Sequence, residues 1–427
     1  MGADREQLAA DTLRTLAMDA VQKAKSGHPG MPMGMADIAV VVWGQFLKVD
    51  PAHPTWPDRD RFVLSNGHGS MLLYGLLHLS GFPMTIDDLQ AFRQLGSRTP
   101  GHPERDPELG IEVTTGPLGQ GFGMGVGMAI AEEHLRATFG SDLVDHRTYG
   151  FVSDGDLMEG LSAEASSLAG HLGLGRLIYF YDDNDISIDG STSLAFSEDV
   201  PARFRALGWH VDEVDGHDRA AISAATSEAL SIEDRPSLVV CHTHIAFGAP
   251  NAQDTAKAHG APLGEEEVRL AKEGMGWNPD QHFFVPSEAY DYFHSAMERG
   301  REARARWLER RQKLEESEPD LVTAWEDRLA TNAVQLDLPG FKTSSSLATR
   351  AASGDLFDQI AEKVPGFLGG AADLVESTKT HISTGGYFAR DNRLGRNLAF
   401  GVREHGMGAI VNGLAVHGGL RPYGSTF

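Results

Sequence analysis

Hydrophobic positions along this 427-residue chain switch repeatedly between helical spacing and short continuous runs. Residues 4–25 carry apolar side chains at helical intervals and end at the breaker cluster Ser26-Gly27-His28-Pro29-Gly30, which predicts an amphipathic helix. Further helices are predicted over residues 35–46, 70–79, 122–139, 163–172, 200–207, 220–230, 286–333, 349–363 and 404–416. Strands are predicted over residues 61–65, 149–153, 177–181, 209–214, 237–242 and 367–370. Strands that alternate with helices at this spacing predict an α/β fold with a doubly wound parallel sheet.

The composition changes once along the chain. Residues 286–333 are helical in pattern and highly charged, and the residues around 336–346 are rich in Pro, Gly, Ser and Thr. A new α/β pattern begins after them. We therefore predict a first domain over residues 1–335 that includes the helical connecting segment, a linker over 336–346, and a second, similar but incomplete α/β domain over 347–427.

Charge and cysteine content exclude several classes of function. The formal net charge is −23, so the phosphate backbone of a nucleic acid would repel the chain, and we expect no nucleic-acid partner. Cys241 is the only cysteine, which excludes an intrachain disulfide and suits a reducing, cytoplasmic setting. No apolar run approaches the ~20 residues of a membrane span, and the charged N-terminal pattern is not typical of a signal peptide. We expect no membrane partner.

Polar side chains follow two consecutive predicted strands. The first cluster is Ser153-Asp154-Gly155-Asp156 and the second is Asp182-Asp183-Asn184. Asp154 and Asn184 are one βαβ step apart, which places both at the sheet edge where open α/β sheets bind ligands. A carboxylate, an amide oxygen and a backbone carbonyl such as that of Ile186 suit Mg²⁺ or Ca²⁺ bridging a diphosphate. Two independent turns, for which Asp-Gly and Asp-Asn are common, also explain this pair taken alone.

Other motifs extend the pattern over essentially the whole chain. They are Ser26 to Gly30, Leu64-Ser65-Asn66-Gly67-His68-Gly69, Gly101-His102-Pro103-Glu104, Gly116-Pro117-Leu118-Gly119-Gln120-Gly121, His259-Gly260-Ala261-Pro262, Ala348-Thr349-Arg350, Gly369 to Leu374 and Gly401 to Met407. With the Asp154 and Asn184 clusters, which resemble a thiamine diphosphate fingerprint, this order resembles the transketolase family. Each motif is weak alone, but the order is highly specific.

The resemblance implies a role for each matched position. The positions that match contacts to the cofactor and its metal are His68, Gly116, Leu118, Asp154, Gly155, Glu159, Asn184 and Ile186. His28, His102 and His259 match groups around the reactive carbon, which guide sugar hydroxyls and move protons, and His259 also matches a cofactor contact. Arg350 and Ser377 match residues that bind the sugar phosphate. A permanently charged guanidinium that can donate two parallel hydrogen bonds fits that task.

Two further positions match the cofactor's pyrimidine ring. Glu404 resembles the carboxylate that protonates the ring, and we expect burial to raise its pKa for that purpose. A helix N-terminal carboxylate that interacts with the helix dipole is the simpler interpretation of Glu404 alone. Phe427 resembles the first aromatic residue around the ring. Ser153, Ala371 and Thr378 depart from the family, which commonly has Gly, Ser and Asn there; Ser153 should be tolerated if its turn needs no positive φ.

The family extends well beyond the position matched by Phe427, so we expect exposed apolar faces and strand edges in the second domain and little or no activity from this chain alone. The resemblance implies transfer of a two-carbon ketol unit between sugar phosphates in the pentose phosphate pathway, with thiamine diphosphate and Mg²⁺ or Ca²⁺. It also implies a homodimer with its active site between subunits, and a complementary C-terminal chain is a further possible partner.

Three alternatives stay open from the sequence. One is another thiamine-dependent ketol transferase, such as a dihydroxyacetone synthase or a deoxyxylulose-phosphate synthase. Another is a non-catalytic subunit or fragment that binds the diphosphate. A nicotinamide-dependent oxidoreductase, suggested by the glycines at 119–127, is disfavoured because no strand with a following acidic residue precedes them in the required order.

Overall fold

The computed structural model describes residues 2–330, 335–344 and 346–427. Its main sheet contains β1 (Arg61–Leu64), β2 (Thr148–Ser153), β3 (Leu177–Asp183), β7 (Ser237–His242) and β6 (His210–Asp215). These five strands are parallel and lie in the order β1-β2-β3-β7-β6. A short antiparallel pair, β4 (Ile186–Ser187) and β5 (Gly190–Ser191), follows β3. The predicted parallel α/β fold is confirmed.

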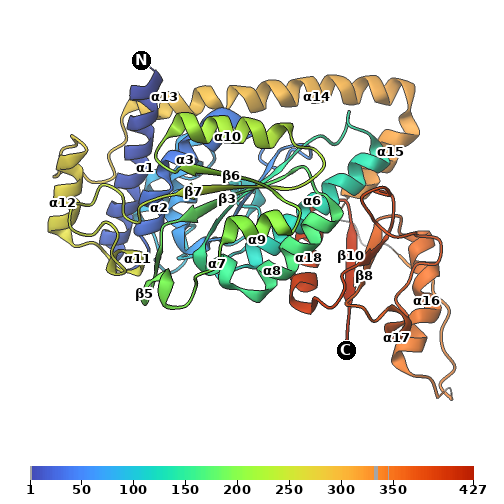
Figure 1. The fold of residues 1–427 in the computed structure, drawn as a ribbon. Coiled ribbons are helices and arrows are strands. Elements are labelled where there is room, and N and C mark those ends of the chain that lie inside the picture. The colour runs from blue at the N-terminus through green and yellow to red at the C-terminus, as the bar shows by residue number, and fades with distance from the viewer. Residues whose placement is uncertain (1, 331–334, 345) are drawn as a thin grey trace.

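Helices cover both faces of this sheet (Figure 1). On one face lie α1 (Gly2–Ala24), α3 (Ala36–Val41), α4 (Ser70–Ser80), α10 (Arg219–Ser231) and α13 (Ser287–Ala296), and on the other α6 (Gln120–Phe139), α8 (Gly160–Leu172) and α9 (Val200–Ala206). Alternate residues of a strand point to opposite faces, so Ile178 and Phe180 pack in the first core while Tyr179 and Tyr181 pack in the second. Both faces of β3 are therefore buried.

Shorter helices and the connecting segment complete the first unit. They are α2 (Gly30–Gly34), α5 (Ile86–Gln90), α7 (Asp154–Met158), α11 (Lys257–Gly260), α12 (Glu265–Gly274), α14 (Glu298–Ser317) and α15 (Pro319–Leu329), with single turns at Val42–Phe46, Gly67–Gly69, Pro107–Leu109 and Thr192–Leu194. The predicted helical segment 286–333 is observed as α13, α14 and α15, and its residues 331–333 lie outside the described residues. Helix α12 was not predicted.

The second unit is smaller and partly shares the first unit's core. It contains α16 (Thr349–Lys363), β8 (Phe367–Ala371), α17 (Val375–Thr378), β9 (Asn397–Ala399), α18 (Glu404–His417) and β10 (Arg421–Ser425). Its parallel sheet has the order β10-β8-β9. Strands β9 and β10 were not predicted, because β9 has three residues and β10 carries Pro422 and Gly424, which edge strands tolerate. Residues 336–344 and 346 of the predicted linker contain no helix or strand, and residue 345 lies outside the described residues.

Helix α18 joins the two units by packing directly against α6. A Cβ atom on Gly127 would lie 2.1 Å from the carbonyl oxygen of Ile410, and one on Gly413 would lie 2.0 Å from that of Met124. The two backbones therefore approach at a distance that only glycine permits. Met407, Ile410 and Leu414 belong to the same buried cluster as residues of α6 and α8, so the second unit depends on the first for part of its core.

Candidate active site

Polar residues at the carboxyl ends of β1, β2 and β3 meet at one edge of the main sheet. The amide nitrogen of Asn66, after β1, donates to the hydroxyl of Ser153 at 2.7 Å, and that hydroxyl donates to Oδ2 of Asp182 at 3.3 Å. Parallel strands place their carboxyl ends at the same edge, which explains why residues 87 and 29 positions apart touch. The edge is therefore a continuous, buried polar network.

Ser153, which departs from the family's glycine, fits its turn. Its φ is −129°, so the turn does not need the left-handed region that favours glycine. Ser153 caps α7 together with Asp156, whose Oδ2 accepts from the Ser153 backbone at 3.2 Å. The expected tolerance of serine is confirmed, and its hydroxyl adds two hydrogen bonds that glycine could not make.

Asp154, Asn184 and Ile186 lie where the sequence predicts a metal site. Oδ1 of Asp154 accepts from the Tyr181 hydroxyl at 2.5 Å, whereas its buried Oδ2 has no hydrogen-bond partner. Asn184 is buried, and its Oδ1 accepts from the Ile186 backbone at 3.0 Å, so one lone pair of that oxygen stays free. This set of oxygen donors fits a hard divalent cation.

Burial raises the pKa of Asp154 to about 8. The neighbouring carboxylates of Asp182 and Asp183 add to this rise, and the hydrogen bond from Tyr181 opposes it. An unpaired, buried carboxyl oxygen among like charges is unfavourable in a protein interior. A divalent cation would supply the missing positive charge, so the residues present fit the metal that the sequence predicts.

Four histidines gather beside this edge. The ring centroid of His28 lies 5.3 Å from that of His68, 5.9 Å from His102 and 5.7 Å from His259, and the rings of His68 and His259 stack at 4.9 Å. Burial lowers the pKa of all four, in His28 to about 4, with smaller effects from His259, Arg93 and His102. All four imidazoles are therefore neutral at pH 7 and can each donate or accept one hydrogen bond.

The predicted cofactor contacts of the Gly116 and Gly155 motifs lie around the same region. Gly116 has φ +139°, and a Cβ atom on it would lie 3.2 Å from Cγ of His102. A Cβ atom on Gly155 would lie 2.9 Å from Cδ1 of Leu118, so these two predicted positions are in contact. Glu159 is exposed at the beginning of α8. The structure therefore places the predicted residues of the first unit along one edge.

The predicted residues of the second unit form a separate group. The guanidinium of Arg350 lies 5.6 Å from the ring centroid of Phe427, and both residues are exposed. Ser377 lines a cavity together with Asp373, Arg403 and residues of α8. Within the part of the chain that the structure describes, no hydrogen bond, ion pair or ring contact joins Arg350, Ser377, Glu404 or Phe427 to the four histidines or to Asp154.

Glu404 corrects one expectation. The family resemblance implies a buried Glu404, but this residue is exposed in the first turn of α18. The reason is the orientation of the helix: its Gly406 backbone donates to Glu164 of α8 at 2.6 Å, and its apolar face packs on α6. The face of α18 that carries Glu404 therefore points to solvent. The described residues of this chain leave the Glu404 carboxylate uncovered.

Sequence reasoning assigned no role to two residues that the structure places at the site. Asp156 is fully buried and accepts from the Ser65 hydroxyl at 2.6 Å and from the Gly119 backbone at 2.8 Å, so it joins three predicted motifs. Its place three residues after Ser153 is a capping signal that could have revealed it. Arg93, which contacts His28, lies outside the quoted motifs and carried no such signal.

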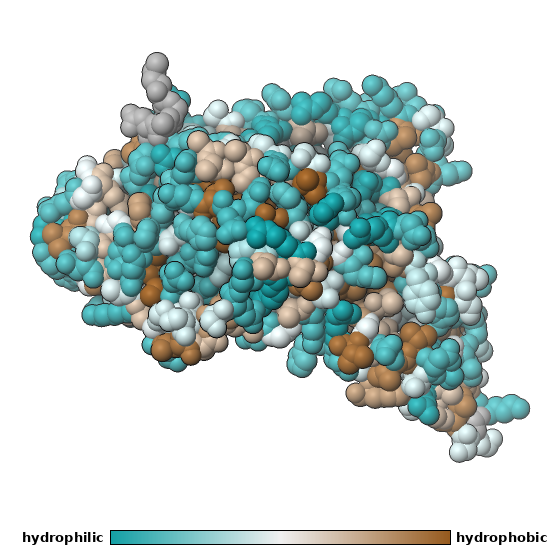
Figure 2. Space-filling model, viewed as in Figure 1, coloured by the Kyte–Doolittle hydropathy of each residue, from teal (hydrophilic) through white to brown (hydrophobic). Residues whose placement is uncertain are grey.

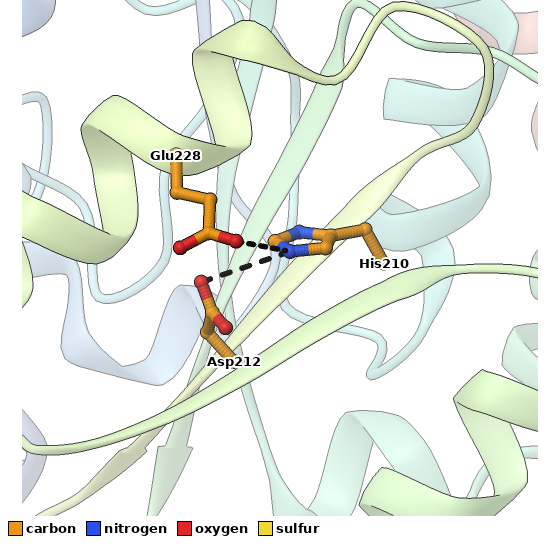
Figure 3. Close-up of side chains that lie close together, drawn as sticks. All are labelled: His210, Asp212 and Glu228. Carbon is orange, nitrogen blue, oxygen red and sulfur yellow. Dashed lines mark ion pairs between the residues drawn. The ribbon is translucent and has the colours of Figure 1, made fainter.

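A second group of potential metal ligands lies away from this edge (Figure 3). Nε2 of His210 is 3.8 Å from Oδ2 of Asp212 and 3.6 Å from Oε1 of Glu228. His210 begins β6, so the group lies at the amino end of a strand in a parallel sheet, opposite the edge that carries Asp154. It belongs to a different part of the molecule from the candidate active site.

These features define a protein that presents a buried carboxyl group with an unpaired oxygen and neutral imidazoles at the carboxyl edge of a parallel α/β sheet. The sequence matches the family described as "Transketolase, thiamine diphosphate binding domain" over residues 5–333 and "Transketolase, pyrimidine binding domain" over residues 345–427. It is 51% identical over 431 residues to a transketolase of Geobacillus stearothermophilus and 50% identical over 430 residues to one of Bacillus subtilis. The chain therefore belongs to the transketolase family.

Solved structures agree with this assignment. A transketolase from Leishmania mexicana matches with a TM-score of 0.95 at 44% identity over 99% of this chain, and so does a transketolase from Pichia stipitis in complex with sedoheptulose-7-phosphate. The chain spans 64% of the length of each of these solved chains, and of the Geobacillus and Bacillus relatives. No helix among the described residues is both long and apolar enough to cross a lipid bilayer.

Proposed function

We propose that this chain carries the cofactor-binding part of a transketolase, which moves a two-carbon ketol unit from a ketose phosphate to an aldose phosphate in the pentose phosphate pathway. The observation that carries the proposal is a buried carboxyl oxygen without a partner, on Asp154, at the same sheet edge as four neutral imidazoles. The first feature suits the binding of a cation, and the second suits a reaction in which oxygen atoms gain and lose protons.

Asp154, Asn184 and the Ile186 carbonyl would hold Mg²⁺ or Ca²⁺, and through it the diphosphate of thiamine diphosphate. When bound, that cofactor supplies the electron sink for breaking and forming the carbon–carbon bond. His68, Gly116, Leu118, Gly155 and Glu159 would contact the cofactor on this chain. Side chains at Gly155 and Gly116 would crowd Leu118 and His102, so glycine at both positions keeps these two predicted contact residues in place.

The remaining predicted residues would bind and orient the sugars. His28, His102 and His259 would donate to or accept from hydroxyl and carbonyl oxygens near the reacting carbon, and their burial keeps them neutral for that exchange. Arg350 and Ser377 would bind the sugar phosphate. The exposed guanidinium of Arg350 can reach an anion from solvent, and the Phe427 ring beneath it restricts its orientation.

We also propose a homodimer in which the second unit of one chain completes the site on the first unit of its partner. The exposed position of Glu404 supports this, because the proposed role of the carboxylate needs a covering surface that the described residues do not provide. Large hydrophobic side chains of the same unit are also exposed, including Val402 at 73% and Phe427 at 74%. Figure 2 shows hydrophobic residues on the surface of the second unit. A partner surface would cover both Glu404 and these side chains.

The division into residues 1–335, 336–346 and 347–427 stays our proposal for the domain boundaries, and a cytoplasmic location stays our proposal for the setting. Both are supported by features already described: the change in composition at 336–346 and the single, buried Cys241.

Calorimetry with thiamine diphosphate and Mg²⁺ tests the proposal. We expect binding by the wild-type chain and at least a 100-fold loss of affinity in Asp154→Ala, because the metal loses its carboxylate. Asp185→Asn is the matched control: it removes an exposed carboxylate one residue after Asn184 and should bind normally. Absence of binding by the wild type, or equal binding by Asp154→Ala, would contradict the proposal.

A two-carbon transfer assay then tests the reaction itself. Turnover of a ketose phosphate with an aldose phosphate supports the proposed activity. We expect little turnover from this chain alone and a gain when a complementary polypeptide with the remaining family positions is added. Turnover with formaldehyde or pyruvate in place of the aldose phosphate would instead favour one of the related synthases.

A further inference from the structure

Arg93 reaches from the loop after α5 into the group of histidines. Its Nη1 donates to the Ser26 hydroxyl at 2.9 Å, and its Nη2 lies 3.2 Å from Nδ1 of His28. The backbone of Arg93 has φ +61° and donates to the Thr99 carbonyl at 2.9 Å, which closes the loop. Arg93 is therefore held both by its backbone and by its guanidinium group.

The chemistry of the two groups determines where the proton of His28 lies. A guanidinium is always charged and has only donors. Nδ1 of His28 must therefore accept, and the single proton of the neutral ring must lie on Nε2. A Cβ atom on Gly260 would lie 3.4 Å from Nε2, so that nitrogen faces the side on which His259 lies.

We propose that Arg93 is a positioning residue that holds His28 in the Nε2–H tautomer, so that His28 binds a substrate oxygen by donating a hydrogen bond and does not act as a base through Nε2. The tautomer of His28 is set by residues of this chain alone, whereas the hydrogen bond to a substrate oxygen rests on the proposed function.

The nearby cation also supports the neutral form. Burial lowers the pKa of His28 to about 4, and Arg93 acts in the same direction as His259 and His102. A protonated His28 would donate from both nitrogens and would repel the guanidinium. Arg93 therefore disfavours both the cation and the other tautomer.

Gly101 provides the space that this arrangement needs. A Cβ atom on Gly101 would lie 2.9 Å from Nε and 3.0 Å from Cζ of Arg93. A methyl group there would push the guanidinium away from His28 without removing any charge. Gly101→Ala is therefore a second variant that tests the same contact.

The experiment is nuclear magnetic resonance of the chain labelled with ¹⁵N in its histidine rings, read by long-range correlation of ring protons with ring nitrogens. His28→Gln assigns the His28 signals. We expect the wild type to show Nε2 protonated and Nδ1 unprotonated at pH 7. Arg93→Met, which keeps the length of the side chain but removes its donors, should give a mixture of both tautomers and a higher pKa of His28.

Two further variants sharpen the result. Arg93→Lys retains a cation and a donor and should retain more of the Nε2–H tautomer than Arg93→Met. Arg98→Met removes an exposed arginine of the same loop that donates to the Pro83 carbonyl, and it should leave His28 unchanged. The His68 signals report whether each variant keeps the surrounding site folded.

Protonation of Nδ1 in the wild type would overturn the proposal, and so would an Arg93→Met spectrum identical to that of the wild type. If Arg93→Met does not fold, the wild-type tautomer and the Gly101→Ala spectrum decide. These outcomes are independent of cofactor binding, so the positioning role and the proposed function can fail separately.

Discussion

The two α/β units of this chain place their candidate chemistry in opposite environments. In the first unit, Asp154 and Asn184 are buried and the four histidines are partly buried, with a network that links the ends of three strands. In the second unit, Glu404 and Phe427 are exposed. The difference teaches that the first unit buries and connects its polar groups within one chain, whereas the second unit leaves its candidate residues exposed among the described residues.

The largest loss of stability is expected from a substitution that disrupts the contact between α18 and α6, which joins the two units. Gly413→Ala places a Cβ atom 2.0 Å from the Met124 carbonyl, so α18 has to move away from α6. We expect a loss of about 3 kcal/mol in the free energy of unfolding, because the close backbone contact cannot adapt. Chemical denaturation measures the loss, and limited proteolysis should cut the second unit first.

Gly408→Ala is the matched control on the same helix. A Cβ atom there would meet nothing within 4 Å, so alanine should stabilise α18 by about 0.5–1 kcal/mol. Equal effects of the two substitutions would show that the units do not depend on this contact.

The next effect concerns the polar network of the first unit. Ser153→Ala removes the acceptor of the Asn66 amide and leaves a buried donor without a partner. We expect a cost of about 1–2 kcal/mol in the free energy of unfolding, measured by thermal or chemical denaturation. Ser193→Ala, at an exposed hydroxyl, should change stability very little. A Ser153→Ala chain as stable as the wild type would contradict the structural role of this network.

Acidification should act mainly on the first unit. The pKa of His28 is lowered from 6.5 to about 4, so between these values the unfolded chain binds a proton that the folded chain does not. The contribution of His28 to the free energy of unfolding therefore falls as the pH drops through this window. Denaturation at pH 7 and pH 5 should show a smaller fall in His28→Asn than in the wild type. The same substitution at the exposed His53 is the control, and an equal fall in His28→Asn and the wild type would contradict the assignment.

The smallest effect is expected at Glu404 in the separated chain. Because the carboxylate is exposed, Glu404→Gln should change the free energy of unfolding by less than about 0.5 kcal/mol. In an assembled dimer with thiamine diphosphate, the same substitution should lower two-carbon transfer strongly, because the carboxylate would then lie against the pyrimidine ring. A large stability change in the separated chain would show that Glu404 is already held by its own chain.

Much of the fold followed from local signals. Helix α16 begins and ends where the spacing of apolar residues predicts, and β2 and β3 differ from prediction by at most two residues at each end. Strands β9 and β10 were missed because their pairing partner β8 lies far along the chain, and neither carries a run long enough to be seen locally. The placement of Asp154 and Asn184 at one edge of the sheet was predictable, because they follow adjacent parallel strands that end there.

The sequence alone determined the order of strands and helices, the residue types at each strand end and the resemblance to one family, because these depend on spacing and chemical type along the chain. Only the tertiary structure decided that Asp154 keeps an unpaired oxygen, that Arg93 touches His28, and that Glu404 faces outward. Burial, hydrogen-bond partners and pKa values arise from residues that are distant in sequence and close in space, and no local pattern contains that information.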